Sequence, residues 1–400
     1  ACLALLSRPE GEWKKVPPEK RRAHVIGVIR KAIAGAEEHG KEEIDFASAC
    51  TIPLKEWKSS AGERWNLSPS PALSVAGKTG LFRVSDLFDP RQGVTPGGCL
   101  GIFLLDEARA AELKLEKKLV HRAIKSREFE RWRTRHTGRV LLYPYVVKDG
   151  DAVPAFALRA ASQDALDFET PLDEREKEVR RGKALDAGTI EKILAHRIGK
   201  GIVKFPNTAR YLSEHYELLE GRVFKKRNIR SFNRRWYEYL WPRDPKLMLA
   251  AIPRIILPRL VKQVRFALDV EGYLSDDGCQ FLFPRHGASQ GIDPFSRKLS
   301  KAMGREVGLD ETLLYCLAFL NSPYAQDRLV SGRRPTPKGF YQISEEFLKE
   351  IPVVLPRNKK EGESIIASVK RLVGGISQED ASKEEARLFK VVTGILTNRA

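Results

Sequence analysis

The 400-residue chain is 42% hydrophobic and 30% charged, which is the balance of an ordinary folded protein of one large domain or two to three smaller ones. Its formal net charge of +18 favours an anionic partner, and because no run approaches the roughly 18 apolar residues of a spanning helix, we expect no membrane insertion. The five cysteines are scattered and form no C-x-x-C pair, which disfavours a disulfide-stapled secreted domain and favours a reduced, cytoplasmic protein.

The first part of the chain predicts one strand and a connection. Residues 1–6 form an apolar run, broken by a Ser-Arg-Pro sequence, that is typical of a short strand. A strand alone at a terminus has no partner sheet, so we expect it to belong to a larger unit. Residues 51–79 are rich in Trp, Ser, Gly and Pro, which is typical of a connecting segment.

The next segments predict a helix, a basic cluster and a strand. Residues 106–124 predict one long helix, capped by Asp106, with its apolar residues on one face. A basic-aromatic cluster follows at 121–133. Residues 139–145 predict a strand that ends in a turn at 148–150.

Helices are predicted in the second half from their apolar periodicity. A helix is expected at 210–219 and a strongly apolar one at 311–330, whose core face carries Leu313, Leu314, Leu317 and Leu320. After Pro356 the chain is charged and helical to its end, with a packing stripe of Leu388, Val391, Val392, Ile395 and Leu396. Residues 164–178 are acidic and polar, which favours an exposed insertion.

The stretch 222–265 carries most of the excess positive charge. Thirteen of its residues are Lys or Arg and two are acidic, and aromatic residues are threaded between them. Solvated charge runs are usually poor in aromatics, whereas a nucleic-acid surface needs cations for phosphates and planar side chains for bases. Nine of the thirteen cations are Arg, whose fork favours directed recognition. A basic solvated face with a few core aromatics is the alternative.

The same region predicts a small antiparallel meander. Short strands are expected at 255–257, 264–268 and 279–283, separated by turns at 269–272 and 275–278. We expect this meander to hold three of the arginines on rigid elements at one edge of the sheet.

The expected contacts to nucleic acid are cations of this stretch, one aromatic residue, one arginine before it and a basic loop after it. The candidates are Arg127, Arg227, Arg230, Arg234, Arg235, Trp236, Arg254, Arg259, Lys262, Arg265, Arg333 and Arg334. Phosphate contacts position a protein on DNA and base contacts read its sequence. The sequence does not distinguish which candidates do which.

Several segments, taken in order, resemble one known domain. Residues 236–245, 253–259, 265–269 and 271–273 resemble the middle of the C-terminal target-recognition domain of TaqI-like adenine DNA methyltransferases, which belong with the wider Eco57I-like restriction-modification enzymes. Residues 82–97 resemble the opening of that domain, and 317–323, 341–344 and 351–352 resemble its close. The resemblance covers residues 80–400 in outline.

The resemblance implies an α+β fold of mixed, mainly antiparallel strands with peripheral helices, preceded by a remnant of an α/β methyltransferase domain. The implied division is a C-terminal remnant of the catalytic domain at 1–50, the connecting segment at 51–79, the DNA target-recognition domain at 80–356 and a C-terminal helical segment at 357–400. Because the chain begins without Met, we expect it to be a piece of a longer polypeptide or a separate subunit.

The chemistry of methyl transfer is expected outside this chain. Adenine methylation needs a glycine-rich loop for S-adenosyl-L-methionine and an Asn/Asp-Pro-Pro-Tyr/Phe loop for the flipped base, and the sequence contains neither. The sequence 321–324, Asn-Ser-Pro-Tyr, lacks the first proline and falls in a predicted helix, which favours packing. We expect no catalytic residue and no cofactor in this chain, and S-adenosyl-L-methionine in the missing catalytic domain.

Two other chemical patterns are weak. A nuclease set of Asp106, Glu116 and Lys118 falls on the predicted helix, where exposed charges need no catalytic role. The seven histidines form no H-x-x-H or H-x-E pattern, so we expect no metal site.

These observations predict sequence-specific DNA recognition by the C-terminal specificity part of an adenine-specific DNA methyltransferase, of the restriction-modification or phage-defence type. The expected partners are double-stranded DNA and a methyltransferase catalytic domain, in the same polypeptide or in a separate subunit. The alternatives are a stand-alone, non-enzymatic DNA- or RNA-binding protein and a scaffold whose basic face binds an acidic protein.

Overall fold

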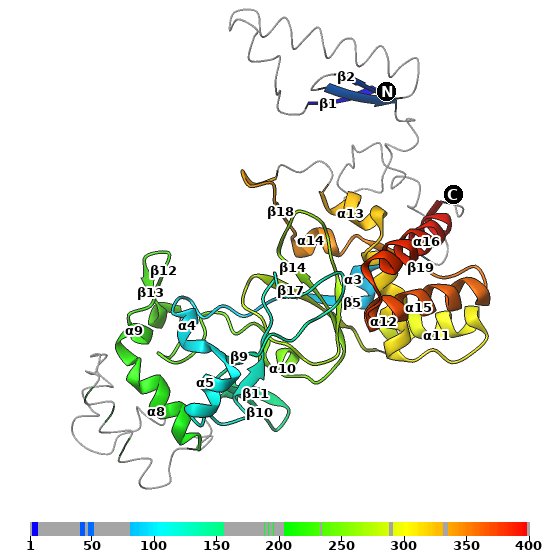
Figure 1. The fold of residues 1–400 in the computed structure, drawn as a ribbon. Helices are drawn as coiled ribbons and strands as arrows, with labels where there is room; N and C mark the ends of the chain where they lie inside the picture. Colours follow the sequence, from blue (N-terminus) through cyan, green and yellow to red (C-terminus); the bar gives the residue numbers. More distant parts are fainter. Residues whose placement is uncertain are drawn as a thin grey trace, which may run out of the picture. The chain divides into compact units, whose positions relative to one another are not determined.

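The computed structural model describes residues 81–155, 204–287 and 291–397, apart from 233 and 331–334, together with three strands before residue 52 and single residues at 188, 191 and 195 (Figure 1). The chain forms two compact units. The first comprises residues 1–79, 330–334 and 394–400, and the second comprises 80–329 and 335–393. The predicted insertion at 164–178 and nearly all of the connecting segment 51–79 lie outside the described residues.

The first unit contains three antiparallel strands: β1 Cys2–Leu6, β2 Lys41–Ile44 and β3 Ala47–Thr51. Their order is β1-β3-β2, with Cys2 opposite Thr51 and Leu6 opposite Ala47. The strand predicted at 1–6 is therefore confirmed, and it has a partner within the chain. The assignment of residues 1–50 to a methyltransferase domain stays a prediction.

The second unit is organised around a five-stranded sheet of order β5-β17-β14-β16-β8. Its strands are β5 Phe88–Gln92, β8 Trp132–Arg133, β14 Arg254–Pro258, β16 Ala267–Asp269 and β17 Cys279–Pro284. All pairs are antiparallel except β16 with β8. The three predicted strands are observed, but the predicted meander is wrong, because β14 lies between β16 and β17 and pairs with both.

Both faces of this sheet are covered. Ile256, Phe281 and Phe283 pack into a large core cluster on one side. Their neighbours Ile255, Leu257 and Leu282 are also buried, on the side where α12 Leu309–Leu320 contacts β14 and β16. Successive side chains of a strand point to opposite faces, so burial at every position requires cover on both sides.

A helical layer forms one of these covers. The helices α11 Ile292–Met303, α12 and α15 Lys359–Gly374 lie side by side (Figure 1), followed by α16 Gln378–Thr397. The predicted core residues of α12, Leu313, Leu314, Leu317 and Leu320, are buried. The helix predicted at 311–330 is interrupted, and α13 Pro323–Val330 begins after the break. At the break the Asn321 side chain is buried and bonds the backbone N–H and C=O of Phe266 at 2.8 and 2.9 Å, which confirms its packing role.

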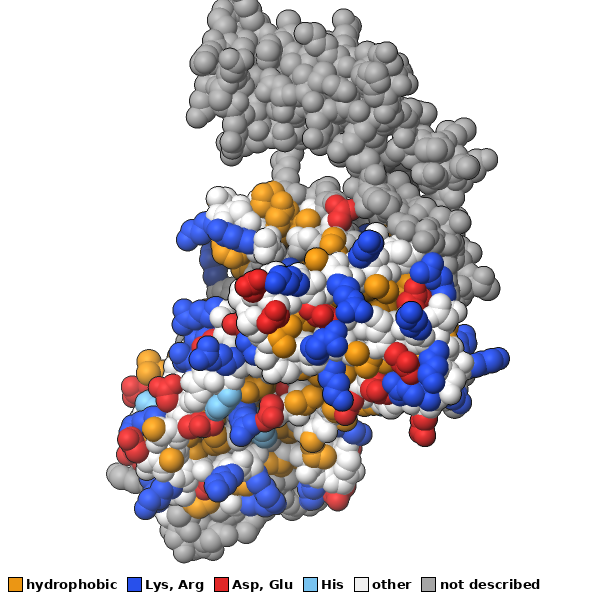
Figure 2. All heavy atoms as spheres, turned by 45° about the vertical axis from the view of Figure 1, so that its right-hand side comes forward, with side chains coloured by type: hydrophobic (Ala, Val, Ile, Leu, Met, Phe, Trp, Pro, Cys, Tyr) orange, Lys and Arg blue, Asp and Glu red, His pale blue; other side chains and the backbone are white. Residues whose placement is uncertain are grey.

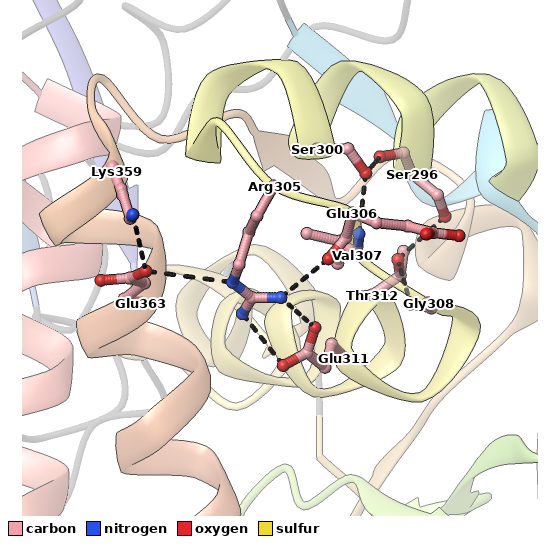
Figure 3. Close-up of polar contacts among 10 residues, drawn as sticks. All are labelled: Ser296, Ser300, Arg305, Glu306, Val307, Gly308, Glu311, Thr312, Lys359 and Glu363. Atoms are coloured by element: carbon pink, nitrogen blue, oxygen red, sulfur yellow. Dashed lines mark hydrogen bonds and ion pairs between the residues drawn. The ribbon is translucent and has the colours of Figure 1, made fainter.

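Arg305 joins the turn between α11 and α12 to α15 (Figure 3). Its guanidinium donates to both carboxylate oxygens of Glu311 at 2.6 and 3.0 Å and lies 3.9 Å from Glu363. These contacts raise the pKa of Arg305 and lower that of Glu311. The bidentate geometry fixes the turn, since two parallel bonds constrain both position and angle.

The other face of the five-stranded sheet is covered by small sheets and two helices. The sheet β6-β9-β7 comprises Leu104–Asp106, Arg139–Leu142 and Val120–Arg122, and β10 Tyr145–Lys148 forms a hairpin with β11 Asp151–Pro154. The helices α8 Pro206–Glu214 and α9 Tyr216–Glu220 pack beside it. Four short helices also belong to this unit: α3 Val84–Leu87, α4 Leu100–Phe103, α10 Pro245–Met248 and α14 Glu345–Leu348. Two further strand pairs are β4 Leu81–Arg83 with β19 Pro352–Val354, and β18 Tyr341–Gln342 with β15 Leu260–Val261. The fold is thus α+β with mainly antiparallel strands, as predicted.

The long helix predicted at 106–124 is wrong. The helix α5 spans only Glu107–Glu112, and Lys114 has a left-handed backbone with φ of 50°. Leu115 and Leu119 are buried all the same, because the turns that follow direct them into the core. The apolar spacing therefore predicted the burial of these two leucines, but not the conformation that achieves it, and Ala108 and Ala111 of the predicted apolar face are exposed.

Glu116, part of the disfavoured nuclease set, caps α8. Its carboxylate accepts the N–H of Asn207 and of Thr208 at 2.9 Å each, and the Thr208 hydroxyl at 2.5 Å. The N-cap residue just before α8, Phe205, supplies no side-chain cap. A carboxylate at a helix N-terminus satisfies free N–H groups and complements the helix dipole.

We expect Glu116→Ala to destabilise the chain by about 1–2 kcal/mol, because three donors at the start of α8 lose their acceptor. Chemical denaturation followed by circular dichroism measures this loss. Glu116→Gln keeps one acceptor oxygen and is the matched control, with a smaller loss. Equal stability of all three proteins would contradict the capping role.

Candidate nucleic-acid interface

The cations of 222–265 divide by residue type. All four lysines are exposed, whereas among the eight arginines with described side chains only Arg227 is exposed. The buried arginines are Arg222 and Arg254, and the half-buried ones are Arg234, Arg235, Arg243, Arg259 and Arg265. Because a guanidinium carries five donors and is weakly hydrated, it can satisfy several buried acceptors at once. The Arg-rich composition therefore serves the interior as well as the surface.

Arg254 is enclosed in the core. Its exposed fraction is 0%, its Nε donates to Asp269 at 2.9 Å, and Nη2 donates to the Tyr273 carbonyl at 2.6 Å. The guanidinium also lies 5.0 Å from the ring centroids of Phe281 and Phe283. The sequence placed Arg254 at a sheet edge, but β14 is central and covered on both faces, so the side chain has no route to a phosphate and we assign it a structural role.

Arg222 has a similar interior position. It donates to the carbonyls of Leu219 and Glu238 at 2.8 Å each and to those of Pro96 and Trp236. Burial lowers its pKa to about 10, which still leaves the group charged at neutral pH. Carbonyls of three backbone segments, at Pro96, Leu219 and 236–238, are held together by this one side chain.

Other candidates are occupied within the fold. Arg235 and Arg234 lie 3.2 and 3.8 Å from Glu238, a carboxyl whose pKa is raised by burial and held down in part by these two arginines. Trp236 is 1% exposed and its ring meets that of Tyr216. Arg265 donates to the Ser126 carbonyl at 2.6 Å and lies over Phe129. Trp236 is too buried to stack on a base, whereas the three half-buried arginines keep part of their surface in solvent.

Three of the predicted contacts are exposed, and Arg259 is half-buried like Arg234. Arg127, Arg227 and Lys262 are exposed, and Arg259 is partly exposed, with its guanidinium 3.7 Å from Asp277. The side chain of Arg230, and Arg333 and Arg334 entirely, lie outside the described residues. Contact of any of these residues with DNA stays a prediction.

Five consecutive contacts connect several basic and aromatic side chains, and a sixth contact lies just after strand β15; we call this set the basic-aromatic path. It runs from the hairpin β12 Val223–Phe224 and β13 Arg227–Asn228 to strand β15. The contacts in order are Phe224 with Trp241 (ring centroids 4.6 Å apart), Trp241 with Arg243 (5.8 Å), Arg243 with Gln92 (2.6 Å), Gln92 with the Asp277 carbonyl (3.4 Å), Asp277 with Arg259 (3.7 Å), and Lys262 with the Phe340 ring (5.3 Å). Cations, amides and aromatic rings thus alternate along a rigid support.

Arg243 holds the centre of the path in a strained conformation. Its φ is 65°, a left-handed value uncommon for a residue with a side chain. Its Nε donates to the Gly93 carbonyl at 3.1 Å and its Nη2 to Gln92 at 2.6 Å, and burial lowers its pKa. Gly93 lies so close to Asp276 that a Cβ would be 1.9 Å from its carbonyl oxygen. This close approach places Gln92 beside Asp277.

Sequence reasoning counted Arg243 among the cations but did not select it, and it missed Gln92 and Asp277. The Arg-Gln-Gly sequence at 91–93 was noted only for its resemblance. Neither the positive φ of Arg243 nor its pairing with Gln92, 151 residues away, leaves a local pattern in the sequence. The only available signal was the Gln-Gly dipeptide, which marks a tight backbone position.

The second basic cluster, at 121–133, is largely neutralised. Arg131 lies 3.0 Å from Glu385, which also accepts the Trp132 Nε1–H at 2.5 Å, and Arg133 lies 3.2 Å from Glu130. Arg122 pairs with Glu271. Figure 2 likewise shows positive and negative side chains interspersed on the face that it presents. The excess of exposed cations is therefore better represented by the basic-aromatic path and its hairpin.

Two negative findings concern the described part of the chain. No group of three or more His, Cys, Asp or Glu side chains there is arranged to hold a metal ion. Among the same residues, no helix has the length and apolarity to cross a bilayer.

Comparison with known proteins gives similarities to restriction-modification proteins. No known protein-family profile matches the chain. Over 82 residues, 20% of this chain and 13% of the relative, it is 29% identical to the type II methyltransferase M.BanIII of Aneurinibacillus aneurinilyticus. Among solved structures, the type IIL restriction-modification enzyme MmeI in complex with DNA aligns with 80% of this chain and 34% of its own, at 14% identity and a TM-score of 0.37. The match spans a small part of the first protein and about a third of the second, and the TM-score is too low to bear on the fold.

Proposed function

We propose that this chain is the DNA target-recognition part of an adenine-specific DNA methyltransferase of a restriction-modification system. The observation that carries the proposal is the basic-aromatic path, in which cations are fixed beside aromatic rings and amides on strands and tight turns. Phosphate contacts need the exposed cations, and base contacts need groups whose geometry is set before binding.

The sequence similarity to a type II methyltransferase supports the same proposal. Methyltransferases that act on a base within a duplex must position the DNA and extrude the target nucleotide. In the proposed division of labour, this chain grips the duplex and the catalytic domain supplies the S-adenosyl-L-methionine site. The finer relation to the TaqI-like domain rests on the ordered segments of the sequence.

We expect the purified 400-residue chain to bind mixed-sequence duplex DNA with a strong salt dependence. If about six exposed cations neutralise phosphates, log affinity should fall with log salt at a slope of about −5. Fluorescence anisotropy of a labelled duplex between low and physiological salt measures the slope. No affinity for any duplex would overturn the proposal.

Two competitors separate the proposal from its alternatives. An RNA duplex that competes as well as DNA would favour a general nucleic-acid binder, because A-form and B-form grooves differ. A polyglutamate chain that competes at equal charge concentration would favour an acidic protein as the partner. We expect neither to displace DNA at equal charge concentration.

A further inference from the structure

The hairpin β12–β13 has an unusual tip. Phe224 pairs with Arg227, so Lys225 and Lys226 form a two-residue turn, and their φ values are 50° and 66°. Positive φ at both central residues defines the type I′ turn, for which Asn-Gly is the favoured sequence. Two lysines at these positions are strained, since a side chain disfavours the left-handed region. The fold therefore holds cations where local conformation favours other residues.

The base of this hairpin is rigid. The Phe224 ring meets Trp241 edge to face, and the Asn228 side chain donates to the Glu220 carbonyl at 2.7 Å. The N–H of Ile229 donates to the carbonyl of Arg222 at 3.0 Å, and the buried guanidinium of Arg222 ties that residue to the core. Strained positions persist only where the surroundings over-determine them, and this base does so.

The tip itself is exposed and cationic. Lys225, Lys226 and Arg227 are consecutive and exposed, and we find no ion pair between them and a carboxylate of the described chain. Val223, at the start of the hairpin, is 60% exposed. The three charges at the end of this short ribbon are therefore available to an anionic partner.

We propose that the β12–β13 hairpin inserts its tip into the major groove of duplex DNA, with Lys225 and Lys226 contacting phosphates and Arg227 reaching the groove. The inference rests on the proposed DNA-binding function. The B-form major groove is about 12 Å wide and admits a two-stranded ribbon, whereas the A-form major groove is too narrow. Duplex DNA fits this tip better than duplex RNA for that reason.

The decisive variant is Lys225→Asn with Lys226→Gly, because it improves the turn and removes the charge together. We expect the Tm to rise by about 1–3 °C, since the new residues favour the type I′ turn. The salt slope of duplex binding should flatten by about 1.8, which corresponds to two lost phosphate contacts. If this variant is more stable than the wild type and yet binds DNA less well, the loss of binding comes from the lost lysines and not from unfolding.

Two further variants isolate the charge. Lys225→Gln with Lys226→Gln keeps the strained turn, so we expect the same change of slope without the rise in Tm. Lys117→Gln with Lys118→Gln removes two exposed lysines from the turn before β7, and we expect it to leave the slope unchanged. Protection of guanine N7 from dimethyl sulfate shows whether the chain occupies the major groove, because N7 lies in that groove. We expect the wild-type chain to protect N7 at its preferred site and both hairpin variants to protect it less.

The outcomes are distinguishable. If the wild-type chain binds duplex DNA and the hairpin variants keep its slope and its N7 protection, the hairpin inference fails and the proposed function stands. If a minor-groove ligand displaces the chain while N7 stays reactive, the groove assignment is overturned. If the wild-type chain has no affinity for duplex DNA, the proposed function fails first and the inference fails with it.

Discussion

Replacing Arg254 by Met is expected to lower the Tm of the chain by roughly 10 °C, because it leaves the Asp269 carboxylate unpaired in the core. Both side chains are 0% exposed, and the Arg254 fork also satisfies the Tyr273 carbonyl. Removing one partner of a buried pair costs about 3–5 kcal/mol, more than loss of an exposed charge. Differential scanning calorimetry measures the shift.

Two controls define the cause. Arg254→Met with Asp269→Asn removes the unpaired charge while keeping an acceptor for the turn at 271–273, whose N–H groups Asp269 caps. We expect it to recover part of the Tm. Arg227→Met, on the exposed hairpin, removes the same charge and should change the Tm by no more than about 1 °C. If the Arg254→Met protein keeps its Tm and binds DNA more weakly, Arg254 contacts DNA and the structural role is wrong.

Arg254 illustrates what the sequence could predict of this fold. Strands are predicted at 255–257, 264–268 and 279–283 from β-branched and aromatic runs between clear turns, and they are observed at 254–258, 267–269 and 279–284. Strand order is a property of the whole chain, however. Strand β14 pairs with β16 on one side and β17 on the other, and β5 and β8 extend the sheet beyond them, so β14 is central and its arginine is internal.

Prediction of the candidate site from the sequence is limited in the same way. A charge count treats Arg222 and Arg227 alike, yet one is tied to four carbonyls and the other is exposed. The difference lies in which backbone carbonyls lack a donor after folding, and this is decided by tertiary contacts. Lysine, with one compact and strongly hydrated charge, is a more dependable sequence marker of exposed positive charge, and all four lysines of the stretch are exposed.

The basic-aromatic path leads to a prediction about sequence preference. The Arg243 guanidinium is fixed by Gln92 and Gly93. The Arg259 backbone is fixed by hydrogen bonds to Gly278 and Ile343, and its guanidinium lies 3.7 Å from Asp277. A guanidinium whose direction is set before binding can make two parallel bonds to guanine O6 and N7. Lys262 is exposed and lies over Phe340, with one charge that can contact phosphate from many directions.

Selection of bound duplexes from a random pool should therefore return an enriched sequence. On that sequence we expect Arg259→Ala and Arg243→Ala each to weaken binding by about 10- to 100-fold, with binding to unselected duplexes nearly unchanged. Lys262→Ala should weaken all sequences alike and flatten the salt slope by about 0.9. Fluorescence anisotropy with the selected and an unselected duplex measures both effects.

The conservative variant Arg259→Lys distinguishes base recognition from charge neutralisation. It keeps the positive charge and loses the fork, so the salt slope should stay at its wild-type value while the preference for the selected sequence falls. Arg243 also bonds the Gly93 carbonyl, so the Tm of its variants must be measured to exclude a change of fold. If the pool yields no enriched sequence, or if every variant loses affinity uniformly, the path binds DNA without reading it. The chain would then be a general nucleic-acid binder, because fixed guanidinium geometry without sequence preference has no role in target recognition.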